Sequence, residues 1–415
     1  MTPTPLAAGA LAGAALVSLI LGPLAGALAA VVVVAAVVAD ALAVRGVPAV
    51  TQRVAPILAR GVTTSLSVAV AAGDQRAARI RQPAPAELAV EPRESDGELE
   101  AALTPRRRGR QTLPAPAVRR DGPLGLGRWH HRAGEPRELI VYPDYPAARR
   151  LALAVRQGRF RQAGRMTRGP LGLGTDFEAV RDYLPDDDIR QVNWPATERM
   201  GRPMSNQFRV EQDREVLLAI DAGRLMAGPI GDATRLDVAV DAAICVALVA
   251  DVLGDRAGVL AFDREIRRHV TPRRAGGDAV VRALFDLEPR AEEPDYELAF
   301  RAVEGGKRSL IVVFCDLLEE SAARPLIDAM SVLTRRHAVI VATATDPDLQ
   351  SRITSPPEVP GDVYAAGVAL EVLAARARAV HALRGAGARV VEAPAGALGA
   401  ACAHAYLTAK ARARL

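Results

Sequence analysis

The chain has 415 residues, a formal net charge of +5, 50% apolar residues and 24% charged residues. This composition excludes an intrinsically disordered chain, and the length allows two or three domains. The three cysteines lie far apart in apolar surroundings, so we expect neither a disulfide framework nor a cysteine metal site.

The first forty residues predict a membrane anchor. No charged side chain precedes Asp40, and two apolar runs, 6–21 and 24–38, are separated by a Gly-Pro pair. A helix over 24–44 would be about 30 Å long, which is the thickness of the hydrocarbon core of a bilayer. We therefore expect residues 1–45 to form a transmembrane helical hairpin.

The charges that follow this hairpin predict its orientation. Arg45, Arg53 and Arg60 come after the second run, whereas the link between the runs is uncharged. The positive-inside rule then places the rest of the chain in the cytoplasm, attached to the inner or plasma membrane. A cleaved signal peptide is the alternative, but such peptides normally begin with a basic segment, which this sequence lacks.

Residues 46–145 are expected to form a small β-sandwich-like module. Loosely alternating stretches at 66–71 and 98–103 are separated by Pro, Gly and Arg clusters, and segment 138–143 has the pattern of a final strand. The arginine run at 106–110 could contact anionic lipid or nucleic acid. We interpret it as a solvated loop near a membrane and expect no nucleic-acid partner.

Residues 146–210 contain the most unusual segment of the chain. Carboxylates, arginines and aromatic rings are concentrated between Gly172 and Trp194, although aromatics make up only 4% of the chain. Buried rings need a packed surface, so the segment predicts a structured polar loop or turn. One interpretation is internal, with arginines paired to carboxylates and with Tyr183 and Trp194 packed against the next domain. The other interpretation is a partner-facing surface or a cation site.

This segment resembles the signature of a bacterial family called domain of unknown function 58. The family pattern runs from a Gly-Thr pair through an Asp-Asp pair to a tryptophan, and a Thr-x-Arg-x-Gly-Arg motif follows. The matching residues here are Gly174, Thr175, Phe177, Arg181, Tyr183, Pro185, Asp187, Asp188, Arg190, Val192, Trp194, Thr197, Arg199, Gly201 and Arg202. The chain departs from the pattern at Asn193, where an Asp is common, and at Pro195, where a Lys is usual.

Residues 211–415 have the pattern of an α/β domain. Strands are predicted at 215–221, 257–263, 266–270, 309–316, 338–346 and 388–392. Helices are predicted at 235–253, 278–287, 296–303, 322–335, 363–383 and 398–411. Near-continuous Val, Ile and Leu strands between helices indicate a mostly parallel sheet that is covered on both faces.

Two of these strands end in acids, Asp221 and Asp316. Because the carboxyl ends of parallel strands meet at the ligand-binding edge of a sheet, we expect both side chains in one crevice. They could hold a cation, cap helix N-termini or pair with an arginine such as Arg224.

The family resemblance makes the cation hypothesis more specific. The α/β domain is similar to Rossmann-like von Willebrand factor A domains, which bind a divalent cation through a D-x-S-x-S loop, a Thr and a second Asp. On this chain the similarity implies Asp221, Asp295 and Asp316 as ligands, with Mg²⁺ as the cation. Gly223 and Leu225 stand in the places of the two serines.

The sequence contains no G-x-S-x-G elbow, no H-E-x-x-H motif and no Walker loop, so we do not expect an enzyme. The resemblance implies an adaptor or chaperone-like partner of a MoxR-type AAA+ ATPase, which would act on client proteins. A metal-dependent hydrolase that uses the carboxylate crevice is the alternative. An envelope structural protein is a third possibility.

Overall fold

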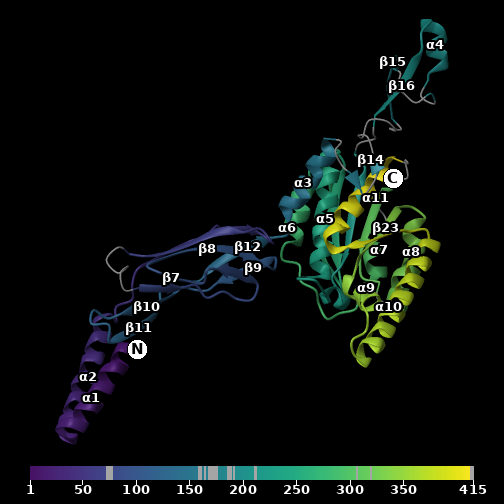
Figure 1. The fold of residues 1–415 in the computed structure, drawn as a ribbon. Coiled ribbons are helices and arrows are strands. Elements are labelled where there is room, and N and C mark those ends of the chain that lie inside the picture. Colours follow the sequence, from purple (N-terminus) through teal and green to yellow (C-terminus); the bar gives the residue numbers. More distant parts are fainter. Residues whose placement is uncertain are drawn as a thin grey trace. The chain divides into compact units, whose positions relative to one another are not determined.

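The contacts within the protein divide it into two compact units, Met1–Tyr142 and Pro143–Leu415. The computed structural model describes residues 1–71, 78–157, 161–162, 165–166, 176–184, 189, 192–209, 213–304, 307–317 and 320–411. Figure 1 shows the first unit as a helix pair followed by β-sheets, and the main body of the second as a sheet covered by helices. The chain is therefore a mixed α/β protein, as the sequence predicts.

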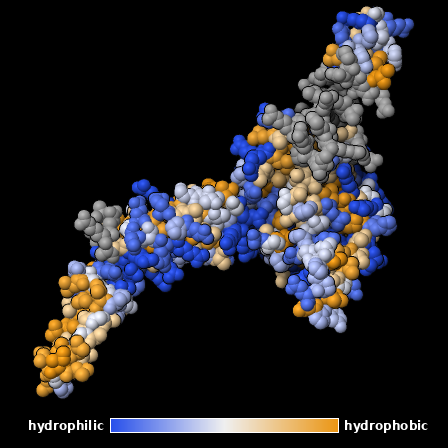
Figure 2. Space-filling view, viewed as in Figure 1, coloured by the Kyte–Doolittle hydropathy of each residue, from blue (hydrophilic) through white to orange (hydrophobic). Residues whose placement is uncertain are grey.

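The first unit begins with two apolar helices, α1 (Pro5–Leu21) and α2 (Pro23–Ala43). Gly22 links them with a φ of 93°, a conformation that favours glycine. The helices pack closely, because a Cβ at Gly26 would lie 2.2 Å from the Cβ of Ser18. Among the described helices, α2 is long and apolar enough to cross a membrane, whereas α1 has 17 residues. Figure 2 shows the apolar surface of this pair.

The rest of the first unit consists of three β-sheets around one core. A four-stranded antiparallel sheet contains β2 (Val50–Arg53), β4 (Thr64–Val70), β8 (Glu98–Pro105) and β6 (Leu88–Glu91). A three-stranded sheet contains β3 (Ile57–Ala59), β12 (Arg137–Tyr142) and β9 (Gly109–Leu113). A five-stranded sheet contains β1 (Thr2–Pro3), β11 (Gly127–Arg132), β10 (Ala117–Asp121), β5 (Ala78–Arg81) and β7 (Glu94–Asp96).

Alternation along these strands produces the core of the first unit. Every second residue of β8 is buried, among them Leu99 and Leu103, and all three sheets contribute side chains to one apolar cluster. The strands predicted at 66–71, 98–103 and 138–143 are confirmed as β4, β8 and β12.

The second unit is built on a six-stranded sheet with the order β21-β20-β17-β22-β23-β24. Its strands are β17 (Glu215–Asp221), β20 (Arg256–Phe262), β21 (Ile266–Arg273), β22 (Leu310–Phe314), β23 (Ala338–Thr345) and β24 (Arg389–Pro394). All neighbours are parallel except β20 and β21, which form an antiparallel hairpin. The six predicted strands of this sheet are confirmed, and their buried Val, Ile and Leu residues explain why the sequence pattern is clear.

Helices cover both faces of this sheet (Figure 1). One face carries α5 (Arg235–Val252), α6 (Gly277–Leu284) and α11 (Leu398–Ala411). The other face carries α7 (Tyr296–Glu304), α8 (Glu320–Thr334) and α10 (Pro360–Gly385), whose buried residues belong to one apolar cluster with Leu217 and Ala219 of β17. Helix α5 begins with a capping box between Thr234 and Asp237 and is buried along most of its length.

Three helices were not predicted from the sequence, α3 (Tyr145–Arg156), α4 (Trp194–Met200) and α9 (Pro347–Thr354). The buried residues of α3 follow helical spacing, but two of the three, Ala148 and Ala152, are alanines, which mark an apolar face less clearly than larger side chains do. Asp144 fixes this helix, because its carboxylate accepts from the backbone N–H of Ala147 and its own N–H donates to Asp241 on α5. Helix α3 is therefore part of the second unit.

Candidate functional site

The order of the six-stranded sheet reverses between β17 and β22, and the two acids predicted to share a crevice follow these strands. Asp221 is buried at the end of β17, and each of its carboxylate oxygens has a partner. The backbone N–H of Gly223 donates to Oδ1 over 2.7 Å, and the hydroxyl of Tyr296 donates to Oδ2 over 2.7 Å. Burial raises the pKa of Asp221 to about 6, and the nearby charge of Asp316 contributes to the rise.

Asp316 lies immediately beyond β22 and is paired with an arginine from α5. The guanidinium of Arg235 donates to Oδ1 of Asp316 and to Oδ2 of Asp346, in each case over 3.1 Å. Burial raises the pKa of Asp316, although Arg235 and Arg376 oppose the rise. The sequence suggested Arg224 as a neutralising residue, but Arg224 pairs with Glu293 instead.

The cation hypothesis can be tested against these contacts. Asp295 caps α7, because its Oδ1 accepts from the backbone N–H of Leu298 over 2.8 Å. Among the described residues, no three His, Cys, Asp or Glu side chains form a group that could hold a metal ion. Both oxygens of Asp221 and Oδ1 of Asp316 are already engaged, and Arg235 supplies positive charge beside Asp316 and Asp346. Oδ2 of Asp316 is buried without a hydrogen-bond partner among the described residues, but one free carboxylate oxygen does not make a cation site. The residues present therefore do not fit a divalent cation site of the expected kind.

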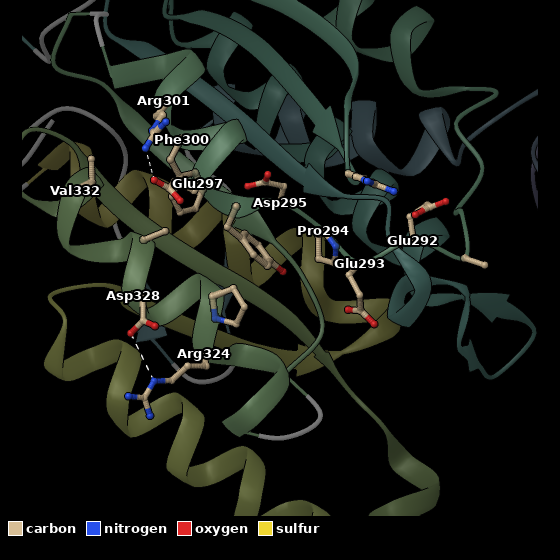
Figure 3. A pocket seen from close by; sticks show the side chains of 15 residues that line it. Glu292, Glu293, Pro294, Asp295, Glu297, Phe300, Arg301, Arg324, Asp328 and Val332 are labelled. Atoms are coloured by element: carbon tan, nitrogen blue, oxygen red, sulfur yellow. Dashed lines mark hydrogen bonds and ion pairs between the residues drawn. The ribbon is translucent and has the colours of Figure 1, made fainter.

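A groove of about 1200 Å³ lies beside Tyr296, between the acidic loop that precedes α7 and helix α8 (Figure 3). Its charged side chains are partly paired with one another. Arg301 pairs with Glu297 on α7, and Arg324 lies 3.6 Å from Asp328 on α8. The groove thus has an ion-paired wall and contains neither a His nor a Cys among its lining residues.

The signature segment forms a separate element, which we call the arm. Strand β15 (Asp176–Asp182) pairs antiparallel with β16 (Met204–Arg209), and helix α4 (Trp194–Met200) lies between them in the chain. Of the predicted motif residues, the described part of the arm includes Phe177, Arg181, Tyr183, Trp194, Arg199, Gly201 and Arg202. Gly174, Thr175, Pro185, Asp187, Asp188 and Arg190 lie outside the described residues.

Local hydrogen bonds explain why the arm folds in this way. The side chain of Asn193 caps α4 by accepting from the N–H of Ala196, and its amide donates to Asn206 on β16 over 2.7 Å. Gly201 ends α4 with a φ of 65°. Arg202 pairs with Asp182 over 3.2 Å. The acids 186–188 and Arg190, whose pairing the sequence suggested, lie outside the described residues.

The aromatic part of the internal interpretation is wrong for Trp194. This side chain is 67% exposed and does not pack against the sheet. Other large apolar side chains of the arm are exposed as well, namely those of Leu184, Ile189 and Met200. The described part of the arm therefore presents apolar surface to solvent, which is a common property of protein-binding sites.

The arm joins the sheet at a set of ion pairs that the sequence analysis did not identify. Asp213 binds Arg256 over 2.7 Å and Arg274 over 3.0 Å, and these contacts hold the pKa of Asp213 well below its usual range. Nearby, the buried Asp255 accepts hydrogen bonds from Tyr406 and Lys410 on α11. This point is at the amino end of β17, whereas Asp221 is at its carboxyl end, about 20 Å away at ~3.3 Å per residue.

Residues 179–352 match the family described as "Protein of unknown function DUF58". The chain is also 26% identical over 184 residues to uncharacterized proteins from Mycobacterium bovis and from two strains of Mycobacterium tuberculosis. This similarity covers 42% of the chain and 56% of each relative, so the chain spans little more than half the length of the relatives. The matched residues include the arm helix, both strand-end acids and the groove. This region of the second unit therefore matches the DUF58 family model, in agreement with the resemblance of the signature segment.

Proposed function

We propose that the protein is a membrane-anchored protein-interaction module that serves as an adaptor or chaperone-like partner of a MoxR-type AAA+ ATPase. The observation that carries the proposal is the exposed Trp194 on the arm, in a chain that contains only two tryptophans. Tryptophan is enriched among the residues that dominate protein interfaces, and leaving it in water forgoes the free energy of burying a large ring.

The architecture of the second unit supports an interaction role. Its strand order and its antiparallel edge strand β21 agree with the von Willebrand factor A-like arrangement that the sequence resembles. Helix α2 provides a candidate anchor, and we assign the bulk of the chain to the cytoplasm because arginines follow this helix. The ATPase and its client proteins are assigned from the family resemblance alone.

A metal-dependent hydrolase is less well supported. Such an enzyme needs a metal with an open coordination position and a general base. Here the oxygens of Asp221 accept from Gly223 and Tyr296, and Arg235 occupies one oxygen of Asp316. In the described contacts these carboxylates bind groups of the protein itself. This favours the interaction role over a metal-dependent hydrolase.

Co-purification from solubilised membranes tests the proposal. We expect an AAA+ ATPase to be recovered with the wild-type chain and to be lost with Trp194→Ala, because the variant removes the large exposed ring. Tyr364→Ala is the matched control, since Tyr364 is an aromatic residue that is 77% exposed on α10. Equal recovery of the ATPase with all three proteins would exclude the arm as the interface. Failure to recover it with the wild type would contradict the assigned partner.

A further inference from the structure

The hairpin formed by β10 and β11 is fastened to the ends of both apolar helices. The backbone N–H of Thr4, which precedes α1, donates to the carbonyl of Leu126, and its hydroxyl donates to the carbonyl of Gly125 over 2.6 Å. On α2, the buried carboxylate of Asp40 accepts hydrogen bonds of 2.8 Å from three backbone N–H groups of the hairpin turn, those of Leu124, Leu126 and Gly127. The turn is thus fixed to the helix pair from both sides.

This turn lies alongside the apolar part of α2 rather than beyond its end. A Cβ at Gly127 would lie 2.4 Å from the carbonyl oxygen of Val37, so only glycine permits this approach. At about 1.5 Å per residue, Val37 lies roughly 9 Å before the end of α2. If α2 enters a bilayer, the turn reaches the region where headgroups meet acyl chains. Leu124, at the tip of the turn, is 65% exposed at this level.

One face of the same sheet is rich in arginine. Directly opposed residues in neighbouring strands share a face of a sheet, and the register places Arg119 opposite both Arg79 and His130. The arginines on this face are Arg79, Arg81, Arg119, Arg128 and Arg132, and the acids are Glu94, Asp96 and Asp121. Arg79, Arg81, Arg119 and Arg128 lie 3.3–4.0 Å from these acids, and five arginines against three acids leave the face with a net charge of +2. Burial lowers the pKa of His130, and the positive charges of the chain's amino terminus, Arg119 and Arg128 lower it further.

We propose that this hairpin docks on the anionic surface of the bilayer that α1 and α2 enter, with Leu124 inserted at the interface and the arginine face bound to acidic phospholipid headgroups. The inference rests on the membrane anchor of the proposed function. Guanidinium groups bind phosphate through paired hydrogen bonds, and basic side chains next to a membrane-crossing helix are attracted to acidic lipids. Figure 2 shows the hydrophilic surface of this module directly beside the apolar helix pair.

Fluorescence of the full-length chain in vesicles tests the insertion. Leu124→Cys would be labelled with an environment-sensitive dye in a Cys245→Ala background, because the two other cysteines are buried. The vesicles would contain phosphatidylcholine alone or mixed with phosphatidylglycerol. We expect a blue-shifted dye that is quenched by brominated lipid, and quenched more strongly by brominated phosphatidylglycerol than by brominated phosphatidylcholine. A dye that remains in water and is quenched by dissolved iodide would overturn the inference.

Matched variants separate the contribution of Leu124 from that of the arginine face. A dye introduced by Val62→Cys, in the turn after β3, is expected to remain in water. Replacing both Arg119 and Arg132 with Gln should abolish the preference for phosphatidylglycerol, whereas replacing the exposed Arg149 and Arg150 of α3 with Gln should not. A preference that survives the first pair would contradict the role of the arginine face.

Alkaline extraction of the vesicles distinguishes this inference from the anchor on which it rests. Protein that resists extraction while the dye at position 124 stays in water would refute the docking of the hairpin and leave the anchor intact. Protein that is stripped from the vesicles would refute the anchor, and the docking inference with it.

Discussion

At the scale of single residues, Asp221 links the candidate crevice to a measurable pH dependence. The carboxyl has a pKa of about 6 in the folded protein and an ordinary value of 3.8. Between these values the folded protein holds a proton that the unfolded chain has released, so the free energy of unfolding falls as pH rises from about 4 to about 6. Asp221→Asn cannot ionise. We therefore expect the variant to lack this fall, which amounts to about 2–3 kcal/mol in the wild type at ~1.4 kcal/mol per pKa unit.

Thermal unfolding of the detergent-solubilised full chain across this pH range, followed by circular dichroism, measures the effect. Glu371→Gln is a suitable control, because it removes a carboxylate that is exposed on α10. Parallel pH profiles for the wild type and Asp221→Asn would show that the buried carboxyl does not titrate in this range.

The pairing of Asp316 shows what a sequence cannot supply at this scale. The sequence predicted that each acid ends a strand and that both share one crevice, because a Val, Ile and Leu run before each acid marks a strand. It suggested Arg224 as the neutralising residue because Arg224 is close to Asp221 in the chain. The observed partner of Asp316 is Arg235, which is 81 positions away, and Arg235 also reaches Asp346. Which arginine pairs with Asp316 depends on where the first turn of α5 lies relative to the sheet.

At the scale of elements, the arm depends on its helix cap. Asn193 both caps α4 and donates to Asn206 on β16. Asn193→Ala removes both hydrogen bonds, and loss of a cap costs about 1 kcal/mol. We expect faster hydrogen exchange at the backbone amides of α4 and unchanged exchange in α5, as measured by mass spectrometry. Glu198→Ala serves as the control, since it leaves the cap in place. Equal exchange in the two variants would mean that Asn193 does not hold the helix.

Elements with a strong local signal were predictable, and elements with a weak one were not. The six strands of the second unit and the capping box of α5 follow from apolar runs and cap residues. Helix α3 was missed because alanines form much of its buried face. The environment of Trp194 was predicted incorrectly. A local enrichment of aromatic side chains indicates that they pack against a surface, but it does not indicate where that surface lies. The ring of Trp194 is 67% exposed, so the described residues do not provide that surface.

At the scale of the whole molecule, the proposed membrane anchor predicts a definite topology. Tyr364→Cys and Leu24→Cys introduce thiols at exposed positions on α10 and at the start of α2. If both ends of the helix pair face the cytoplasm, a membrane-impermeant maleimide should label position 24 in intact cells, whereas position 364 should react only after permeabilisation. Labelling of position 364 in intact cells would place the second unit outside and exclude a cytoplasmic ATPase as its partner.

The attachment of the arm at Asp213 has a mechanical consequence. A force applied to β16 of the arm would reach the sheet at β17, which is hydrogen-bonded to β20 on one side and to β22 on the other. A load directed along this strand would shear two ladders of hydrogen bonds together instead of peeling one edge strand away. The clamp of Asp213 on Arg256 and Arg274 would resist the first displacement. A motor that pulled on the arm along this strand would therefore displace the second unit as one rigid body before unfolding its sheet.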